Sequence, residues 1–323
     1  MRRFLDLMDI RKFRWWVQLF GFVLFVYGAN FGLVLDQDLP TFACPYVDGR
    51  SGNCILFVLQ HRLTIPLDQV VTMRGLGLLM ALVGFFIWFV ALSKSWCGFM
   101  CPMGTLQDAI AALREKMGIP YSTYAKPTMA KLGKIKWVLL SLLLLIPLAM
   151  ANALPGVGKL SHEWATPFCM ICPSRTLLPL FSGDFSQLGL DLSSIPKLVL
   201  TGLGLLVTGA VLVGAFVKKR FFCLFCPMSA LHYVFSKLAF LKLIKEPDKC
   251  TRCGNCYRAC DVGIHEIAED LEHRNLTTQN CLLCLDCISA CPEEDCLKLT
   301  FMGKPLYRST ELGFFKRHSN ESK

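Results

Sequence analysis

Four long apolar segments divide this chain into helical and polar parts. They run from Trp15 to Leu35, from Thr72 to Leu92, from Lys136 to Ala153 and from Leu198 to Val217. Each has about the ~20 residues that a helix needs to cross the hydrocarbon core of a bilayer. A hydrophobic fraction of 54% over 323 residues argues against four core helices of a water-soluble protein. The pattern therefore predicts four membrane-spanning helices.

Two shorter helical patterns follow the second and fourth apolar segments. One covers Pro102–Met117 and begins directly after Cys101, and the other covers Pro227–Lys245 and begins directly after Cys226. Proline is favoured at the first position of a helix, where its missing N–H costs nothing. We therefore expect two helices that start at a cysteine on the same face of the membrane. A polar, cysteine-rich segment begins after them, at residue 246.

Basic residues predict the orientation of the membrane helices. They gather before the first helix, between the second and third, and after the fourth: Arg2, Arg3, Arg11, Lys12, Arg14, Lys94, Arg114, Lys116, Lys126, Lys131, Lys134, Lys136, Lys218, Lys219 and Arg220. Cytoplasmic loops carry this excess. The sequence thus predicts a multi-pass protein of the inner membrane with both termini in the cytoplasm. The net charge of +10 follows from this topology and does not indicate nucleic-acid binding.

Two cysteine runs in the C-terminal segment predict two [4Fe–4S] clusters. They are Cys250-x2-Cys253-x2-Cys256-x3-Cys260 and Cys281-x2-Cys284-x2-Cys287-x3-Cys291-Pro292. In this bacterial ferredoxin pattern the fourth cysteine of each run binds the other cluster. One cluster is then assigned to Cys250, Cys253, Cys256 and Cys291, and the second to Cys260, Cys281, Cys284 and Cys287. Zinc sites and disulfides fit this spacing less well. The first run departs from the pattern, because Asp261 stands where the second run has proline.

Two further cysteine pairs lie on the predicted cytoplasmic side of the membrane helices. Cys97-x3-Cys101-Pro102 follows the second helix, and Cys223-x2-Cys226-Pro227 follows the fourth. The two halves therefore share an order of elements, which suggests a parallel repeat of two helix pairs. Two pairs that meet at the repeat axis supply the four thiolates of a third [4Fe–4S] cluster. Free or redox-active thiols, or a copper or zinc site, are the alternatives.

Four more cysteines, Cys44, Cys54, Cys169 and Cys172, fall in the two loops on the opposite side. The same count allows a fourth cluster at the outer face. Disulfides are the competing interpretation, because the periplasm is oxidising and the first pair is separated by nine residues. Cys296 is the remaining cysteine and is interpreted as a packed thiol.

A quinone headgroup needs polar partners at the membrane, where ionisable side chains are rare. The candidates are His61 with Arg62 and His162 with Glu163 on the outer side, and His232 on the inner side. The simpler interpretation of each histidine is a packed or interfacial side chain, since Trp164 beside His162 is typical of an interfacial belt. The sequence contains no glycine-rich dinucleotide motif, so we expect neither nicotinamide nor flavin in this chain.

The doubled Cys-Pro element beside membrane helices, joined to the Cys250–Cys291 framework, resembles the NapH/MauN group of membrane iron–sulfur proteins and the membrane half of NosR. The resemblance implies electron transfer between the quinone pool and a periplasmic iron–sulfur or cytochrome c subunit. It also allows a cytoplasmic electron donor or acceptor. In this group the inner motif is usually Cys-x3-Cys-Pro in both copies, and here the second copy is one residue shorter.

The expected fold class is mostly α. It combines a four-helix transmembrane bundle over residues 1–245 with a small α+β ferredoxin-like domain over residues 246–301 and a tail over residues 302–323. The expected function is that of a quinol dehydrogenase-like subunit. One alternative is a membrane reductase that supplies electrons for the maturation or regulation of a metalloenzyme. A redox sensor without throughput is less favoured, because the tail offers no output domain.

Overall fold

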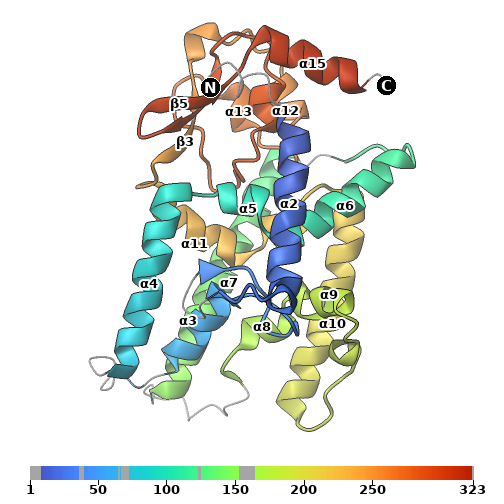
Figure 1. Ribbon diagram of the computed structural model, residues 1–323, viewed down its shortest axis with the longest axis vertical. Coiled ribbons are helices and arrows are strands. Elements are labelled where there is room, and N and C mark those ends of the chain that lie inside the picture. The colour runs from blue at the N-terminus through green and yellow to red at the C-terminus, as the bar shows by residue number, and fades with distance from the viewer. Residues whose placement is uncertain are drawn as a thin grey trace.

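The computed structural model of the protein describes residues 9–35, 40–64, 66, 73–122, 125–152 and 164–321. Four long helices extend away from a small unit that contains a three-stranded sheet and several short helices, and the two parts lie end to end (Figure 1). The long helices are α2 (Ile10–Tyr27), α4 (Met73–Leu92), α7 (Lys126–Ala151) and α10 (Ile195–Val217). Both described chain ends lie in the region of the small unit.

Two of the long helices are long and apolar enough to cross a membrane among the described residues. They are the spans Lys126–Met150 of α7 and Ile195–Val217 of α10. The apolar part of α4 covers Leu79–Leu92 and is shorter. The predicted first span, Trp15–Leu35, also differs, because α2 ends at Tyr27 and continues as the 3-10 turn η1 (Gly28–Phe31). The four-helix membrane bundle stays a prediction.

Large apolar side chains nevertheless cover the outside of all four long helices. Trp16 on α2 is 72% exposed, and Leu206 on α10 is 74% exposed. Other exposed members of this surface are Phe20, Val23, Met80, Ile87, Val138, Leu145, Val199 and Val213. A water-soluble monomer rarely exposes so continuous an apolar surface, which fits a lipid environment better.

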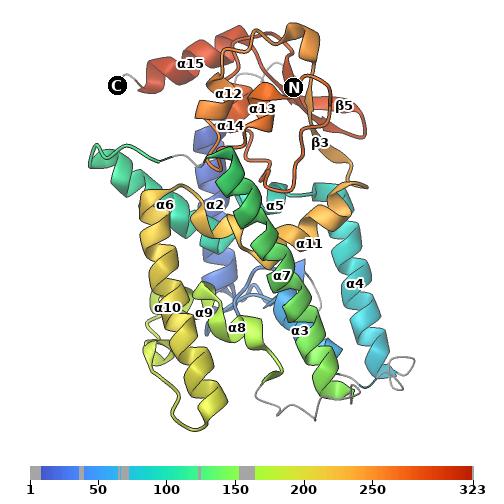
Figure 2. The ribbon, with the colours of Figure 1, turned by 180° about the vertical axis from the view of Figure 1, so that it is seen from behind.

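Short elements fill the space between the long helices. They are the parallel pair β1 (Pro40–Thr41) and β2 (Asn53–Cys54), and the helices α3 (Ile55–Leu63), α8 (Pro167–Ile171), α9 (Pro173–Phe181) and η4 (Ser186–Leu188). Figure 2 shows α8 and α9 beside the middle of α10. There Gly204, the tenth residue of α10, lets the Met170 carbonyl approach, since a Cβ at Gly204 would lie 2.6 Å from that oxygen.

A second group of short helices lies where the long helices meet the small unit: α5 (Ser95–Phe99), α6 (Pro102–Lys116), η5 (Phe221–Leu224) and α11 (Pro227–Ser236). The predicted helix from Pro102 agrees with α6 to within one residue. The helix predicted over Pro227–Lys245 is wrong in its second half, because α11 ends at Ser236 and Leu241–Lys245 forms a strand. Its side chains alternate between buried and half-buried, which is the period of a strand.

The small unit contains one antiparallel sheet with the order β3-β4-β5, formed by Leu241–Lys245, Leu297–Phe301 and Lys304–Arg308. Its other elements are η6 (Pro247–Lys249), α12 (Asn255–Arg258), α13 (Glu266–Glu269), α14 (Asp286–Ser289) and α15 (Glu311–Glu321). β3 and β5 both fall outside the predicted range of 246–301. We therefore refer to residues 241–321 as the ferredoxin-like unit.

Candidate metal centres

Two cavities in the ferredoxin-like unit are each lined by four of the eight cysteines of the doubled pattern. Cys250, Cys253, Cys256 and Cys291 line the first. Cys260, Cys281, Cys284 and Cys287 line the second. These are the two sets that the sequence assigns to separate clusters. Four thiols around one enclosed space are the donor set of a [4Fe–4S] cluster, so the residues present fit that group.

The two cysteine loops share an unusual backbone conformation. Arg252 and Gly254 have φ of 57° and 75° on either side of Cys253. Leu283 and Leu285 have φ of 51° and 68° on either side of Cys284. Left-handed residues in such loops turn backbone N–H groups toward an anion. One of these groups, the N–H of Leu283, donates to Cys281 Sγ at 3.5 Å.

Cys296 is packed, as expected, but it also lines the first of these cavities. A hydrogen bond with the Cys296 thiol lowers the pKa of Cys291. Each set has two buried cysteines, but Cys253 of the first set is exposed to solvent and no cysteine of the second set is. The first centre is therefore more accessible to water than the second.

A third, larger cavity between the long helices is lined by the other eight cysteines. We refer to Cys97, Cys101, Cys223 and Cys226 as the inner cysteines, and to Cys44, Cys54, Cys169 and Cys172 as the outer cysteines. The sequence places these two sets at opposite faces of the membrane, but the structure brings both to one continuous space. All eight thiols are free of disulfide bonds.

Arg220 holds the turn that carries Cys97 in place. Its side chain is buried and donates to the carbonyl oxygens of Cys97 at 3.1 Å and Gly98 at 3.4 Å. Its charge is balanced by Asp108 on α6, whose two carboxylate oxygens accept from Arg220 at 2.7 and 2.6 Å. A buried guanidinium is costly without an anionic partner, so breaking this pair is unfavourable. The pair therefore holds the segment before Cys223 against the helix that follows Cys101.

The turn of the inner cysteines is in direct contact with the ferredoxin-like unit. Leu282 lines both the large cavity and the cavity of Cys281 and Cys284. Gly98 makes this approach possible, because a Cβ there would lie 2.5 Å from the Leu282 carbonyl oxygen. Two cysteine sets from distant parts of the chain are thus separated by a single backbone segment.

Two buried lysines, Lys94 and Lys136, fix the loop that precedes Cys281. Lys94 donates to the Gln279 carbonyl oxygen at 2.6 Å, and Lys136 donates to the same oxygen at 2.9 Å and to Asn280 Oδ1 at 2.6 Å. Burial lowers the pKa of Lys94 to about 8. From the sequence both lysines are only cytoplasmic charges, but in the structure they hold the two parts of the protein together.

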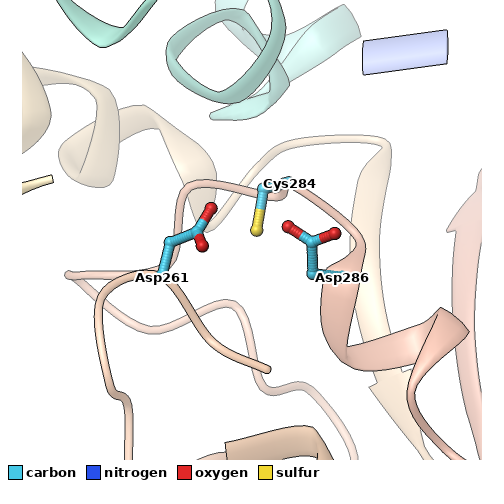
Figure 3. A group of neighbouring side chains, drawn as sticks. All are labelled: Asp261, Cys284 and Asp286. Carbon is cyan, nitrogen blue, oxygen red and sulfur yellow. The ribbon is translucent and has the colours of Figure 1, made fainter. Parts of the chain in front are cut away.

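A buried ionic cluster joins α2 to the ferredoxin-like unit. Figure 3 shows the carboxylates of Asp261 and Asp286 on either side of the Cys284 sulfur. Arg14 donates to both carboxylates, at 3.0 Å to Asp261 and by a short contact to Asp286. Burial alone raises the pKa of a carboxylate, and it keeps that of Asp286 above its usual value. Burial acts in the same direction at Asp261, but Arg14 together with Lys219, Arg220 and Arg11 outweighs it, so the pKa of Asp261 is lowered. Asp261, the departure from the ferredoxin pattern, thus has a partner on α2.

The two candidate quinone histidines that the structure describes, His61 and His232, lie on different helices, α3 and α11. His232 is fully buried, with its ring 3.8 Å from that of Phe89 and its Nδ1 3.7 Å from Cys97 Sγ. Its ring thus faces one of the inner cysteines. His61 is exposed in the last turn of α3, a helix that the sequence analysis did not predict. His162 and Glu163 lie outside the described residues.

Two protein families match this chain. The 4Fe-4S dicluster domain matches residues 242–292. The 4Fe-4S binding domain matches twice, over residues 73–120 and 200–245. The double match falls on the two segments that carry the inner cysteines and supports the internal repeat that the sequence suggests.

Several known proteins are similar to the chain at low identity. The protein YccM of Escherichia coli K12 is 25% identical over 215 residues, which cover 66% of this chain and 53% of that protein. The ferredoxin-type protein NapH of the same organism is 24% identical over 88% of this chain and 91% of its own length. The methylamine utilization ferredoxin-type protein MauN of Methylorubrum extorquens is 26% identical, over 78% and 76%. The chain spans about half the length of YccM. No solved structure matches.

Proposed function

Because the chain is a NapH/MauN-type iron–sulfur protein, we propose that it passes electrons between the membrane quinone pool and a redox partner. Electron transfer through iron–sulfur centres is what the family assignment itself supports. The membrane, the quinone and the additional inner centre are the finer parts of the proposal. The observation that supports these finer parts is the series of three cysteine-lined cavities, which runs from the ferredoxin-like unit to the space between the long helices.

In this proposal the inner cysteines hold a third [4Fe–4S] cluster, and such clusters supply one-electron transfer when bound. The residues of the chain position this site and connect it to the ferredoxin-like unit. Arg220 and Asp108 keep the turn of Cys97 in place, and Leu282 brings the second ferredoxin cavity into contact with the inner one. The inner cavity and the second ferredoxin cavity are lined mainly by apolar side chains and cysteines, which limits the access of water to both.

The membrane location rests on the two long apolar helices and on the apolar outer surface of all four. With 23 residues, α10 is about 34 Å long at 1.5 Å per residue, close to the ~30 Å core of a bilayer. In this proposal the excess of basic residues orients the helices so that the ferredoxin-like unit faces the cytoplasm. A periplasmic iron–sulfur or cytochrome c subunit is the proposed partner on the other side.

His61 is the proposed contact for a quinone headgroup. Its ring is exposed at the end of α3 and stacks on Phe57 with 6.0 Å between ring centroids. It directly follows Gln60, which contacts the sulfur of Cys169 at 3.1 Å. A quinone at His61 would thus lie beside the outer cysteines and in reach of lipid.

The test is to mix the purified protein, with its clusters loaded, with a quinol and to follow bleaching of the visible cluster absorbance. A fast bleaching that depends on the quinol supports the proposal. No response to any quinol would overturn the quinone part of it. The inner centre is tested by replacing Cys97 and Cys226 with serine, which should lower bound iron by about four atoms per chain. Unchanged iron would mean that the inner cysteines hold no cubane.

A further inference from the structure

The outer cysteines are surrounded by a copy of the structural unit that surrounds the inner ones. The first half of this unit is a helix that starts directly after a cysteine. Cys54 is the N-cap of α3, with φ −62° and ψ 128°, and Cys101 is the N-cap of α6, with φ −67° and ψ 119°. The second half is a Phe-Cys-x2-Cys-Pro segment, which occurs at residues 168–173 and again at residues 222–227.

A buried glutamine joins the two halves at each site. Gln60 lies six residues after Cys54, and Gln107 lies six residues after Cys101. Gln60 is 0% exposed and Gln107 is 1% exposed. Glutamine is usually found at the surface, so two buried ones in corresponding positions call for a polar reason.

The two glutamines make the same three contacts. The Oε1 of Gln60 accepts from the N–H of Phe168 at 3.1 Å, and the Oε1 of Gln107 accepts from the N–H of Phe222 at 2.9 Å. Each Nε2 donates to the carbonyl oxygen four residues earlier, at 3.0 and 3.1 Å. Each Nε2 also contacts the sulfur of the cysteine that directly follows that phenylalanine, at 3.1 Å for Cys169 and 3.8 Å for Cys223.

The second cysteine of each Phe-Cys-x2-Cys-Pro segment is also placed alike. Cys172 is the N-cap of α9, with φ −69° and ψ 129°, and Cys226 is the N-cap of α11, with φ −63° and ψ 119°. Each site therefore has two cysteines at helix starts. Free backbone N–H groups at a helix start favour a negatively charged group in front of them.

We propose that the outer cysteines hold a [4Fe–4S] centre of the same construction as the inner one, and that Gln60 and Gln107 are positioning residues that donate to a ligand sulfur of each. The proposal deepens the proposed function and rests on it, since it assigns the outer set to the same relay. A buried amide N–H forms a stronger hydrogen bond with a thiolate, which is a charged acceptor, than with a disulfide sulfur, which accepts only weakly. The buried glutamines therefore favour thiolates over a disulfide at these positions.

The location of this outer centre also suits a relay. The Met170 carbonyl, between Cys169 and Cys172, packs against Gly204 near the middle of the 23-residue α10. Gly204 is nine residues from the start of α10, or about 14 Å along the helix axis. The outer cysteines therefore lie at mid-depth of this helix and share a cavity with the inner ones, although the sequence places them in an outer loop.

The first experiment counts iron and acid-labile sulfide in the wild type and in a variant with Cys169→Ser and Cys172→Ser. We expect about sixteen irons in the wild type and a loss of about four in the variant. About twelve irons in the wild type, with outer thiols that react with an alkylating agent only after reduction, would show a disulfide and overturn the proposal. This outcome leaves the quinol response of the other centres in place, so the two failures can be told apart.

The second experiment uses Gln60→Leu and Gln107→Leu, each of which serves as the control for the other. Hydrogen bonds to sulfur raise the potential of a cluster. Each variant should therefore lower the midpoint potential of one EPR signal, a different signal in each case, while iron per chain stays constant. If Gln60→Leu moves no signal, or the same one as Gln107→Leu, the outer site is not a second copy of the inner one.

Discussion

Removing the Arg14 side chain should loosen the ferredoxin-like unit more than any exposed ionic contact at the same interface. Arg14 is 8% exposed and lies against three carboxylates, those of Asp261, Asp286 and Asp108. Arg14→Met leaves these charges buried with fewer partners. Breaking a buried ion pair in this way costs about 3–5 kcal/mol. We take about 3 kcal/mol here, because Arg11 and Arg317 still lie 3.6 and 3.9 Å from Asp286.

The assay is thermal loss of the visible cluster absorbance in detergent. For a protein of this size about 3 kcal/mol corresponds to a fall of about 5–10 °C in the midpoint. Lys126→Met is the matched control, because Lys126 pairs with Glu269 across the same interface but with side chains that are 60% and 53% exposed. Such a surface pair contributes little, so no measurable change is expected.

A double variant, Arg14→Met with Asp286→Asn, separates charge from packing. It should recover part of the lost stability, since the uncompensated carboxylate is then removed together with its partner. Equal midpoints for Arg14→Met and Lys126→Met would refute the reasoning. So would a double variant whose two losses simply add.

Three further predictions follow from the geometry of the centres. Gly98→Ala should push the inner turn away from the Leu282 carbonyl and slow electron transfer between the inner and ferredoxin centres, measured by rapid-freeze EPR, whereas Gly84→Ala, with no atom within 4 Å of its Cβ, should not. An iron chelator should first remove the cluster that Cys253 holds, because that cysteine is exposed, and Mössbauer spectra should show about four irons lost before the rest. Lys245→Met should destabilise the ferredoxin-like unit by about 3 kcal/mol in denaturant unfolding, because the buried lysine donates to three backbone carbonyls.

The sequence predicts those parts of the fold that depend on the spacing of residues close together in the chain. The cysteine runs from Cys250 to Cys291 predict which thiols line which cavity, because the spacing is imposed by the shape of a cubane. The helix starts after Cys101 and Cys226 are confirmed for the same kind of reason, since proline favours the first helical position. Apolar length likewise locates α7 and α10.

Long-range polar contacts are the part that spacing could not reveal. Arg14 and Asp286 are 272 residues apart, and nothing in either segment indicates the other. One signal was available, namely the carboxylate of Asp261 in place of the usual proline, which implies a nearby positive charge. Gln60 and Gln107 also carried a signal, because each stands six residues after a cysteine that starts a helix. The sequence predicts the outer cysteines in outer loops because they fall between predicted membrane helices, whereas in the structure these connections fold inward and line the large cavity.

The contacts of Lys94 and Lys136 with the loop before Cys281 have a consequence for how electrons move through the protein. Some carriers collect an electron at one site and deliver it at another by swinging a tethered head group. Here Lys94 and Lys136 both donate to the Gln279 carbonyl oxygen, and these contacts hold the ferredoxin-like unit against the long helices. The rate of electron transfer through such an assembly should not depend on solvent viscosity. It should depend on the distances between neighbouring redox centres and on their potentials.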